Sequence, residues 1–193
     1  MNNKILMTVF VVSLLLCGMA IWLLQPKPRQ EAPPAVIKVE QLPREVLLYF
    51  ADPEGRYLVA ETQQIAGCAE DSDCISKLFS ALAAGPRGEL LPILPAQARV
   101  LNVELREDLV LVDFNSAFVH AHPGGSVPEL LTVYGLVNSL AVNFPYLKQL
   151  QILVDGQPVP SLKGHVSLSR PVMADFSYSR APQSGTAQEQ INE

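Results

Sequence analysis

Apolar residues form two different patterns along this chain of 193 residues. The first pattern is an unbroken run from Ile5 to Leu24 that contains no charged residue. A helix needs about 20 apolar residues to cross the hydrocarbon core of a bilayer. A secretory signal peptide has a shorter apolar stretch of about 7–15 residues and a small-residue cleavage site, which is missing here. Residues 1–24 are therefore predicted to be an uncleaved transmembrane anchor, with a cleaved signal sequence as the alternative.

Cys17 adds a second alternative, a lipoprotein. The motif Leu-Leu-Cys-Gly around Cys17 faintly resembles an acylation signal, but Leu16 is larger than such a signal requires and the apolar run continues past the cysteine. Lys4 precedes the run, and Lys27 and Arg29 follow it, so the positive-inside rule is nearly balanced. Because the N-terminal tail is short, we expect it to stay in the cytoplasm and the C-terminal domain to lie outside.

The second pattern covers residues 44–173, where short apolar runs alternate with amphipathic segments. Strands are predicted at Glu45–Phe50 and Arg56–Thr62, and the turn signal Asp-Pro-Glu-Gly between them is typical of a hairpin. Further strands are predicted over residues 98–105, 108–114 and 149–154. The middle one of these three is nearly all apolar, as expected of a central strand.

Two helices are predicted between the strands. The first covers residues 72–84, where Ile75, Leu78, Phe79 and Leu82 recur at helical spacing. Asp71 or Ser72 can cap its start, and Gly85-Pro86 should end it.

The second helix covers residues 126–143, and Ser126 and Glu129 fit a capping box at its start. Its predicted apolar face consists of Leu130, Val133, Tyr134, Val137, Leu140 and Ala141.

This order, β-β-α-β-β-α-β, predicts an α+β fold with one mixed sheet of about five strands and two helices packed on it. Residues 25–43 form a proline-rich linker that should be extended and semi-rigid. Residues 174–193 carry few apolar side chains and are expected to be a disordered tail.

The net charge and the cysteines limit the kinds of protein that this chain can be. A net charge of −5 does not suggest a nucleic-acid-binding protein, which usually has a basic surface. Cys68 and Cys74 are the two cysteines outside the apolar run, and paired cysteines in an exported domain are plausible disulfide partners. Two free thiols, or half of a metal site, are the alternatives.

Candidate catalytic chemistry is sparse. His120 and His122 would point to the same side of a strand and could hold a metal, but glycines and a proline follow them, which favours solvated loop histidines. Asp113 interrupts an apolar strand, where a buried aspartate could be catalytic, but it is expected to cap a turn at Asn115-Ser116. His165 has no accompanying nucleophile motif. The sequence contains no G-x-S-x-G elbow, phosphate loop or H-E-x-x-H motif.

Taken together, these segments resemble the GerMN domain, named after the sporulation and germination protein GerM. The resemblance runs from about Val46 to Met173. It rests on VLLYFADPEGRYLVAE, LFSALAAGP, ARVLNVELREDLVLVDFNSAF, ELLTVYGLVNSLAVNFP and LQILVDGQPVPSLKGHVSLSRPV, in that order.

The resemblance implies an exported bacterial envelope protein, membrane-anchored or lipid-modified, with a domain similar to ring-building domains. It brings no catalytic residues. The founding member carries two copies of the domain and this chain carries one, which puts a sporulation role in doubt, and the stretch with Cys68 and Cys74 is a feature of this chain.

Pattern and resemblance together predict a non-enzymatic interaction or assembly domain, without cofactor or metal, in cell-envelope or sporulation-type complexes. Residues 5–24 would hold it at the cytoplasmic membrane as a single-pass protein, with the domain in the periplasm or its equivalent. Its expected partners are envelope proteins or a second copy, with peptidoglycan as a further candidate and no nucleic acid. The alternative is an envelope enzyme, or a metal- or peptidoglycan-binding protein, that uses the loop of His120 and His122.

Overall fold

The computed structural model describes residues 42–180 and five isolated positions nearer the N-terminus: 7, 13, 15, 16 and 19. Those five positions are helical. The rest of the expected anchor, the linker up to residue 41 and residues 181–193 lie outside the described part of the chain. Among the described residues, no helix is both long and apolar enough to span a bilayer. The transmembrane anchor therefore stays a prediction.

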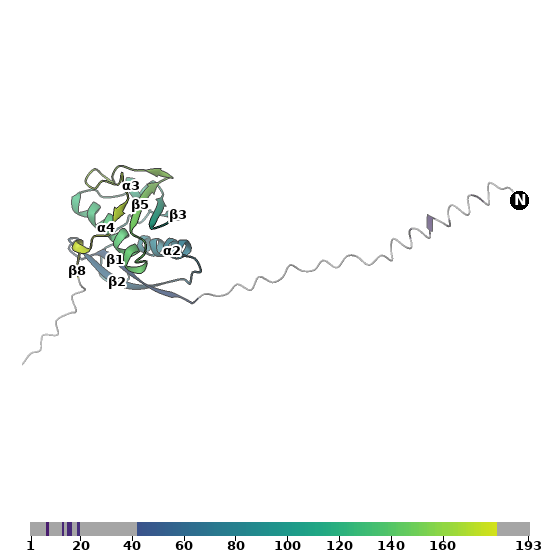
Figure 1. The fold of residues 1–193 in the computed structure, drawn as a ribbon, viewed down its shortest axis with the longest axis horizontal. Helices are drawn as coiled ribbons and strands as arrows, with labels where there is room; N and C mark the ends of the chain where they lie inside the picture. Colours follow the sequence, from purple (N-terminus) through teal and green to yellow (C-terminus); the bar gives the residue numbers. More distant parts are fainter. Residues whose placement is uncertain (1–6, 8–12, 14, 17–18, 20–41, 181–193) are drawn as a thin grey trace, which may run out of the picture. The chain divides into compact units, whose positions relative to one another are not determined.

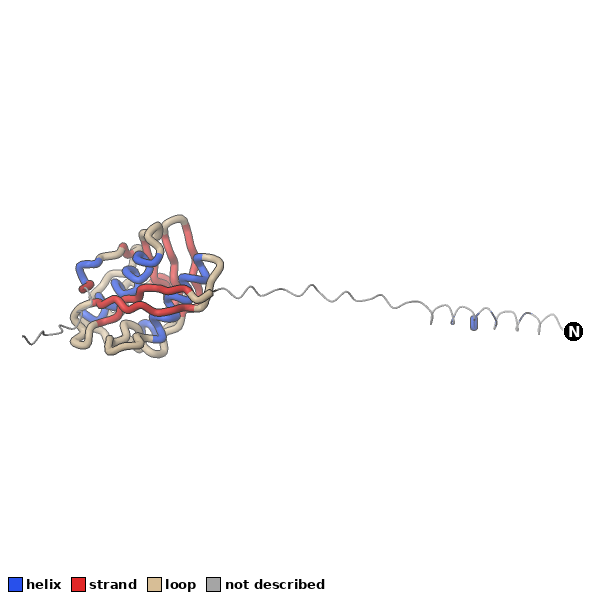
Figure 2. Tube along the Cα trace, turned by 90° about the horizontal axis from the view of Figure 1, so that it is seen from below, coloured by secondary structure: helices blue, strands red, loops and turns tan. Residues whose placement is uncertain are grey.

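Residues 42–180 form an α+β domain with two separate sheets. The first sheet contains, in spatial order, β1 (Arg44–Ala51), β2 (Leu58–Ile65) and β8 (Ser179–Arg180). The second contains β3 (Val100–Arg106), β4 (Leu109–Phe114), β5 (Gln149–Val154) and β6 (Gln157–Pro158), and β7 (Val172–Met173) also pairs with β5. The helices are α2 (Asp71–Ala84), α3 (Ala117–His120), α4 (Ser126–Asn143) and the short 3-10 helix η1 (Phe176–Tyr178). Figure 1 shows the hairpin β1–β2 apart from the sheet of β3 and β5, and in Figure 2 the two sets of strands cross steeply.

The hairpin and the crossover follow from local sequence. β1 and β2 pair antiparallel over their whole length, and the Asp52 carboxylate accepts the Arg56 and Tyr57 N–H groups at 2.5 and 2.9 Å, which closes the turn. β3 and β4 pair antiparallel around Glu107, whose φ is 55°. β4 and β5 are parallel, with α4 in the connection between them, so these elements form a β-α-β crossover.

The prediction of a single sheet is wrong, because α4 occupies the edge of β1 where another strand would pair. The Tyr49 N–H donates to Ser139 Oγ at 2.9 Å, and the Leu47 N–H donates to Asn143 Oδ1 at 3.1 Å. Asn143 Nδ2 returns a bond to the Leu47 carbonyl at 2.7 Å. Buried backbone groups need partners, and here two helix side chains supply them. The hairpin therefore does not extend the sheet of β3–β7.

Helix α4 is buried on nearly all sides, whereas the sequence predicted one apolar face. From Leu131 to Leu140 every residue except Tyr134 is buried. Three of these buried residues are polar, and each is bonded: Thr132, Asn138 and Ser139. A helix that is buried all round is central to its domain, so α4 positions everything that packs against it.

Gly135 lets α4 approach the hairpin closely. A Cβ atom at this position would collide with Ile93 Cδ1 and lie 3.3 Å from Leu58 Cδ2 and 3.4 Å from the Tyr49 carbonyl oxygen. Helix propensity alone makes Gly→Ala stabilising by about 1 kcal/mol, whereas overpacking costs about 1–3 kcal/mol. We expect Gly135→Ala to lower the free energy of unfolding in a urea titration. The exposed Ser126→Ala should leave it unchanged, and a gain in stability for Gly135→Ala would contradict the close approach.

The predicted core of α2 is confirmed. Ile75, Leu78, Phe79 and Leu82 are all fully buried. The start of α2 differs from the expectation, since its N-cap residue is Glu70 and no side chain caps it. Gly85 ends the helix with a φ of 93°, as its sequence predicted.

A disulfide joins Cys68 to Cys74 in the first turn of α2, with an S–S distance of 1.95 Å. The Lys77 ammonium donates to the Gly67 carbonyl at 2.7 Å and so stabilises the same turn.

Closing a loop of this length stabilises a fold by about 2 kcal/mol, because it lowers the conformational entropy of the unfolded chain. Cys68→Ala with Cys74→Ala should therefore lower the free energy of unfolding by about 2 kcal/mol. Reductant should destabilise the native protein and leave the double variant unchanged; equal sensitivity of both would contradict a stabilising role for the bond.

The prediction of a disordered tail from residue 174 is wrong for residues 174–180, which contain η1 and β8. Residues 174–180, called here the C-terminal strap, contain η1 and β8 and lie against α4 and β2. β8 pairs in parallel with Leu58 and Val59. Asn138 of α4, fully buried, donates to the Asp175 carbonyl at 2.8 Å and accepts the Asp175 N–H at 3.0 Å. The strap is short, so its order depends on partners far away along the chain.

Candidate functional site

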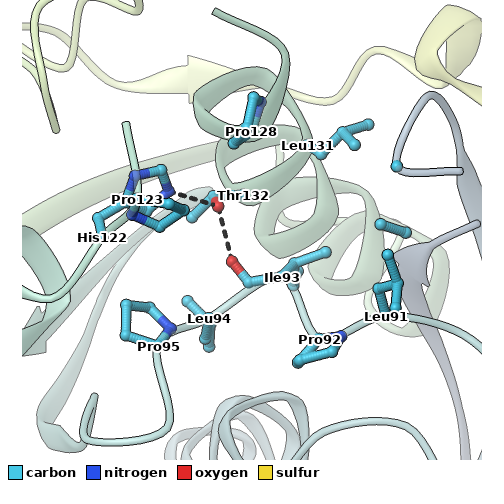
Figure 3. A pocket seen from close by; sticks show the side chains of 12 residues that line it. Leu91, Pro92, Ile93, Leu94, Pro95, His122, Pro123, Pro128, Leu131 and Thr132 are labelled. Atoms are coloured by element: carbon cyan, nitrogen blue, oxygen red, sulfur yellow. Dashed lines mark hydrogen bonds between the residues drawn. The ribbon is translucent and has the colours of Figure 1, made fainter. Parts of the chain in front are cut away.

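An open cleft of about 300 Å³ lies where the hairpin turn, residues 91–95 and the start of α4 meet (Figure 3). Its walls are mostly aliphatic and include four prolines. The lining residues are Ala51, Gly55, Leu91, Pro92, Ile93, Leu94, Pro95, His122, Pro123, Pro128, Leu131 and Thr132. Concave, mainly apolar sites with few polar groups are the usual form of binding sites.

Local backbone features hold each wall of the cleft in place. Leu91 and Ala51 exchange two backbone hydrogen bonds of 2.8 and 3.0 Å, which fix residues 91–95 to the end of β1. Pro92 and Pro95 lock their own φ angles and stiffen this segment. Pro128 lies in the first turn of α4, where a missing N–H is tolerated.

His122 joins two of these walls. Its side chain is 5% exposed, and Nδ1 accepts the Gly124 N–H at 3.0 Å. Nε2 lies 3.0 Å from Thr132 Oγ1, and that hydroxyl donates to the Ile93 carbonyl at 2.6 Å (Figure 3). Since Nδ1 is an acceptor and the hydroxyl proton is committed to Ile93, the neutral ring must carry its proton on Nε2. The chain of bonds runs from Gly124 through His122 and Thr132 to Ile93.

Burial lowers the pKa of His122, and the positive charge of Lys163 acts in the same direction, while Glu129 opposes them. Burial disfavours the charged form of a histidine, so this ring is neutral at neutral pH. The expectation of a solvated loop histidine is wrong at this position because the loop folds back onto Thr132.

His120 does not join His122 in a common site. His120 ends helix α3 and is exposed, whereas His122 is buried. The argument that residues i and i+2 share a side holds only on a strand, and these residues are not on one. Within the described residues, no group of three or more His, Cys, Asp or Glu side chains is placed to hold a metal ion.

Glu129 and His165 come together instead, which the sequence did not predict. The fully buried Glu129 carboxylate lies 2.7 Å from His165 Nδ1 and accepts the N–H groups of His165 and Val166 at 3.0 and 3.2 Å. The expected capping box with Ser126 is wrong, because the N-cap residue is Gly125 and no side chain caps the helix. Burial raises the pKa of Glu129, but the bonds from His165, Val166 and Lys163 outweigh it and lower the pKa to about 2.

Asp113 has a structural partner, although not the one expected. Its Oδ1 accepts the Gly156 N–H at 2.9 Å and so fastens the turn after β5 to the end of β4. Asp113 does not cap a turn at Asn115-Ser116, contrary to the prediction from the sequence. Asn115 itself accepts the Arg99 N–H through its side chain at 2.9 Å.

The outer rim of the cleft is apolar and accessible. Leu91, one of the lining residues, is 42% exposed, and Val127, next to the lining residue Pro128, is 46% exposed. Within residues 42–180 every buried side-chain nitrogen or oxygen has a hydrogen-bond partner. The cleft therefore offers apolar contact, and its polar wall groups are already engaged with protein. Sequence reasoning missed Thr132, Leu91 and Val127; the one signal was the concentration of prolines in residues 92–95 and 123–128.

Fold and cleft define the class of protein: an α+β domain with two small sheets, a buried central helix and an open apolar cleft. The family model Germane, described as "Sporulation and spore germination", matches residues 47–160. The chain therefore belongs to the Germane, or GerMN, family, and the resemblance seen in the sequence is confirmed.

Three solved structures are similar to this chain. The chain is 26% identical to a protein whose structure is named "Putative Lipoprotein from Clostridium perfringens", with 69% of this chain and 89% of that chain covered and a TM-score of 0.51. It is 20% identical to the first GerMN domain of the sporulation protein GerM from Bacillus subtilis, with 68% and 96% covered and a TM-score of 0.50. The tandem GerMN domains of the same protein also match at 20% identity, with 69% and 46% covered and a TM-score of 0.49. No curated protein matches this chain.

Proposed function

We propose that this chain is a non-enzymatic docking domain of the bacterial cell envelope. Residues 5–24 would hold it at the cytoplasmic membrane, and the cleft would bind an apolar segment of another envelope protein. The observation that carries the proposal is the cleft itself: an open aliphatic surface with Leu91 exposed in its lining and Val127 exposed beside the lining residue Pro128. A concave, mainly apolar surface is the usual form of a binding site.

Three findings support an envelope location. The apolar run of residues 5–24 is long enough to cross a bilayer. The Clostridium perfringens relative is named as a lipoprotein, the other common way of attaching a domain to a membrane. A disulfide persists in oxidising compartments outside the cytoplasm, and this domain contains one.

The cleft would remain accessible in a tethered protein. The chain enters the domain at Arg44, the first residue of β1, and the cleft is lined by Ala51, the last residue of β1. A strand of this length separates its ends by about 23 Å at about 3.3 Å per residue. The point of attachment therefore lies well away from the cleft.

Site-specific photo-crosslinking in cells tests the proposal on the full-length chain. A photoreactive residue at Leu91 or Val127 should yield one discrete adduct with an envelope protein. The same residue at Leu101, which is 54% exposed on β3 and lies outside the cleft, is the matched control and should yield none. Adding Val127→Asp should abolish the Leu91 adduct, since a carboxylate on the rim opposes apolar docking.

Adducts of the same kind from Leu101, or a Leu91 adduct that survives Val127→Asp, would overturn the proposal. An adduct between two copies of this chain would show that the cleft serves self-association. Retention of the protein on purified peptidoglycan, unaffected by Val127→Asp, would assign binding to a different surface.

A further inference from the structure

His122 connects two parts of the cleft wall. His122 is the only acceptor that the structure gives to the Gly124 N–H, and it bonds to Thr132 on the opposite side of its ring. Pro123, the residue between them, lines the cleft, as does Pro128. The bond that holds Gly124 next to the ring thus depends on a nitrogen that can gain a proton.

We propose that His122 is an acid-sensitive switch of the cleft: a proton on Nδ1 removes the acceptor of the Gly124 N–H and releases Pro123 and Gly124 from the cleft wall. Protonated Nδ1 is a donor and faces another donor, so the contact must break. Nε2 keeps its bond to Thr132, which holds the ring near its place while the following residues move. The Glu129 N–H keeps its bond to the Gly125 carbonyl at 3.1 Å, so α4 stays in place.

The backbone after His122 can absorb such a movement. Gly124 and Gly125 have φ angles of 77° and 97°, in the left-handed region that glycine adopts freely. Two adjacent glycines at the entry to a long rigid helix are suited to act as a hinge. A displaced Pro123 would change the lining of the cleft.

The charges that face His122 favour a switch at acidic pH. Burial and Lys163 lower the pKa of His122, and Glu129 of α4 raises it. Residues 91–95, Leu-Pro-Ile-Leu-Pro, contribute no titratable group. The hairpin turn reaches the cleft through Gly55, and its Asp52 carboxylate is held by backbone N–H groups. The pKa of His122 is therefore below the ordinary value of a histidine, and the ring gains its proton at acidic pH.

The proposed switch would act on the cleft of the proposed function. Its test nevertheless needs no binding partner of this protein. In the full-length protein, ¹⁵N resonances of the imidazole should show a proton on Nε2 and none on Nδ1 at neutral pH. As His122 titrates, hydrogen-exchange protection of the Gly124 amide should fall about tenfold, the loss of one hydrogen bond. Protection of the Tyr49 amide, bonded to Ser139 elsewhere, should stay constant.

His122→Asn is the matched variant, because its Oδ1 can accept the Gly124 N–H in place of Nδ1 and does not titrate. Gly124 protection in this variant should be independent of pH. The proposal is overturned by a proton on Nδ1 at neutral pH, by Gly124 protection that ignores the titration of His122, or by parallel loss at Gly124 and Tyr49. The ¹⁵N resonances and the hydrogen exchange of Gly124 and Tyr49 are measured on the unaltered protein, so they test the proposal even if the variant does not fold. They do not depend on the outcome of the crosslinking experiment.

Discussion

Replacing Glu129 by Gln should lower the free energy of unfolding at neutral pH by about 3 kcal/mol, because a buried carboxylate that accepts several N–H groups would lose its charge and one of its two oxygens. The acceptor bonds at 2.7–3.2 Å tie α4 to His165 and Val166. In the variant, the amide NH₂ must face at least one of these donors. Urea unfolding measured by circular dichroism would give the difference.

The pH dependence of stability should identify the same carboxylate. The folded pKa of Glu129 is about 2, against an ordinary value of 4.5. Between these two values the unfolded chain binds more protons than the folded one, so stability falls as the pH falls through this window. A shift of this size corresponds to roughly 3 kcal/mol, present above about pH 4.5 and lost toward pH 2.

Glu129→Gln should remove most of this acid sensitivity, since the amide does not titrate. Glu104→Gln is the matched control, because Glu104 pairs with Arg106 on the exposed face of β3 and such pairs contribute under about 1 kcal/mol. Acid unfolding curves of wild type and Glu129→Gln that run parallel would show that the carboxylate is not held as the structure places it.

Local patterns predicted the elements well, because their causes are local. Helix α4 has the predicted bounds, and α2 begins one residue earlier than expected. Strands β4 and β5 also match closely, and β5 ends at a turn in which Asp155 and Gly156 have positive φ angles. Apolar spacing and glycine or proline stops act over a few residues, so the sequence displays them directly.

The arrangement of the sheets could not be predicted in the same way. It depends on Asn143 and Ser139, which bond to β1 residues 96 and 90 positions earlier in the chain. In the sequence they are two polar residues on a mostly apolar helix and suggest solvent exposure. The true signal was Gly135, Ser139 and Asn143 at intervals of four, a stripe of small and polar residues along one side of α4. Its meaning requires knowing which strand lies beside it.

The candidate site was harder still to predict. The sequence drew attention to His120 and His122 as a pair, yet the structure uses them separately. The role of His122 follows from Thr132 and Ile93, which are 10 and 29 positions away and carry no motif. The family assignment did not supply these residues either, because the cleft is a property of packing.

A chain that ends at Met173 should be less stable than the full-length protein by about 4 kcal/mol, since it lacks the C-terminal strap and the apolar and hydrogen-bonded contacts that the strap makes. Tyr178 stacks on Tyr134 with ring centroids 4.4 Å apart, and Arg180 lies 3.5 Å above the Tyr57 ring. The family match ends at residue 160, and neither it nor the sequence pattern marks the strap as part of the domain.

A chain that ends at Arg180 is the matched control and should be as stable as the full-length protein, because it keeps every contact of the strap. Asn138→Ala in the full-length chain should reproduce part of the loss, about 2 kcal/mol, by leaving the Asp175 backbone N–H and carbonyl without their partner. Equal stability of the chains ending at Met173 and Arg180 would remove the strap from the fold. If the two differ while Asn138→Ala has no effect, the aromatic contacts hold the strap and the amide does not.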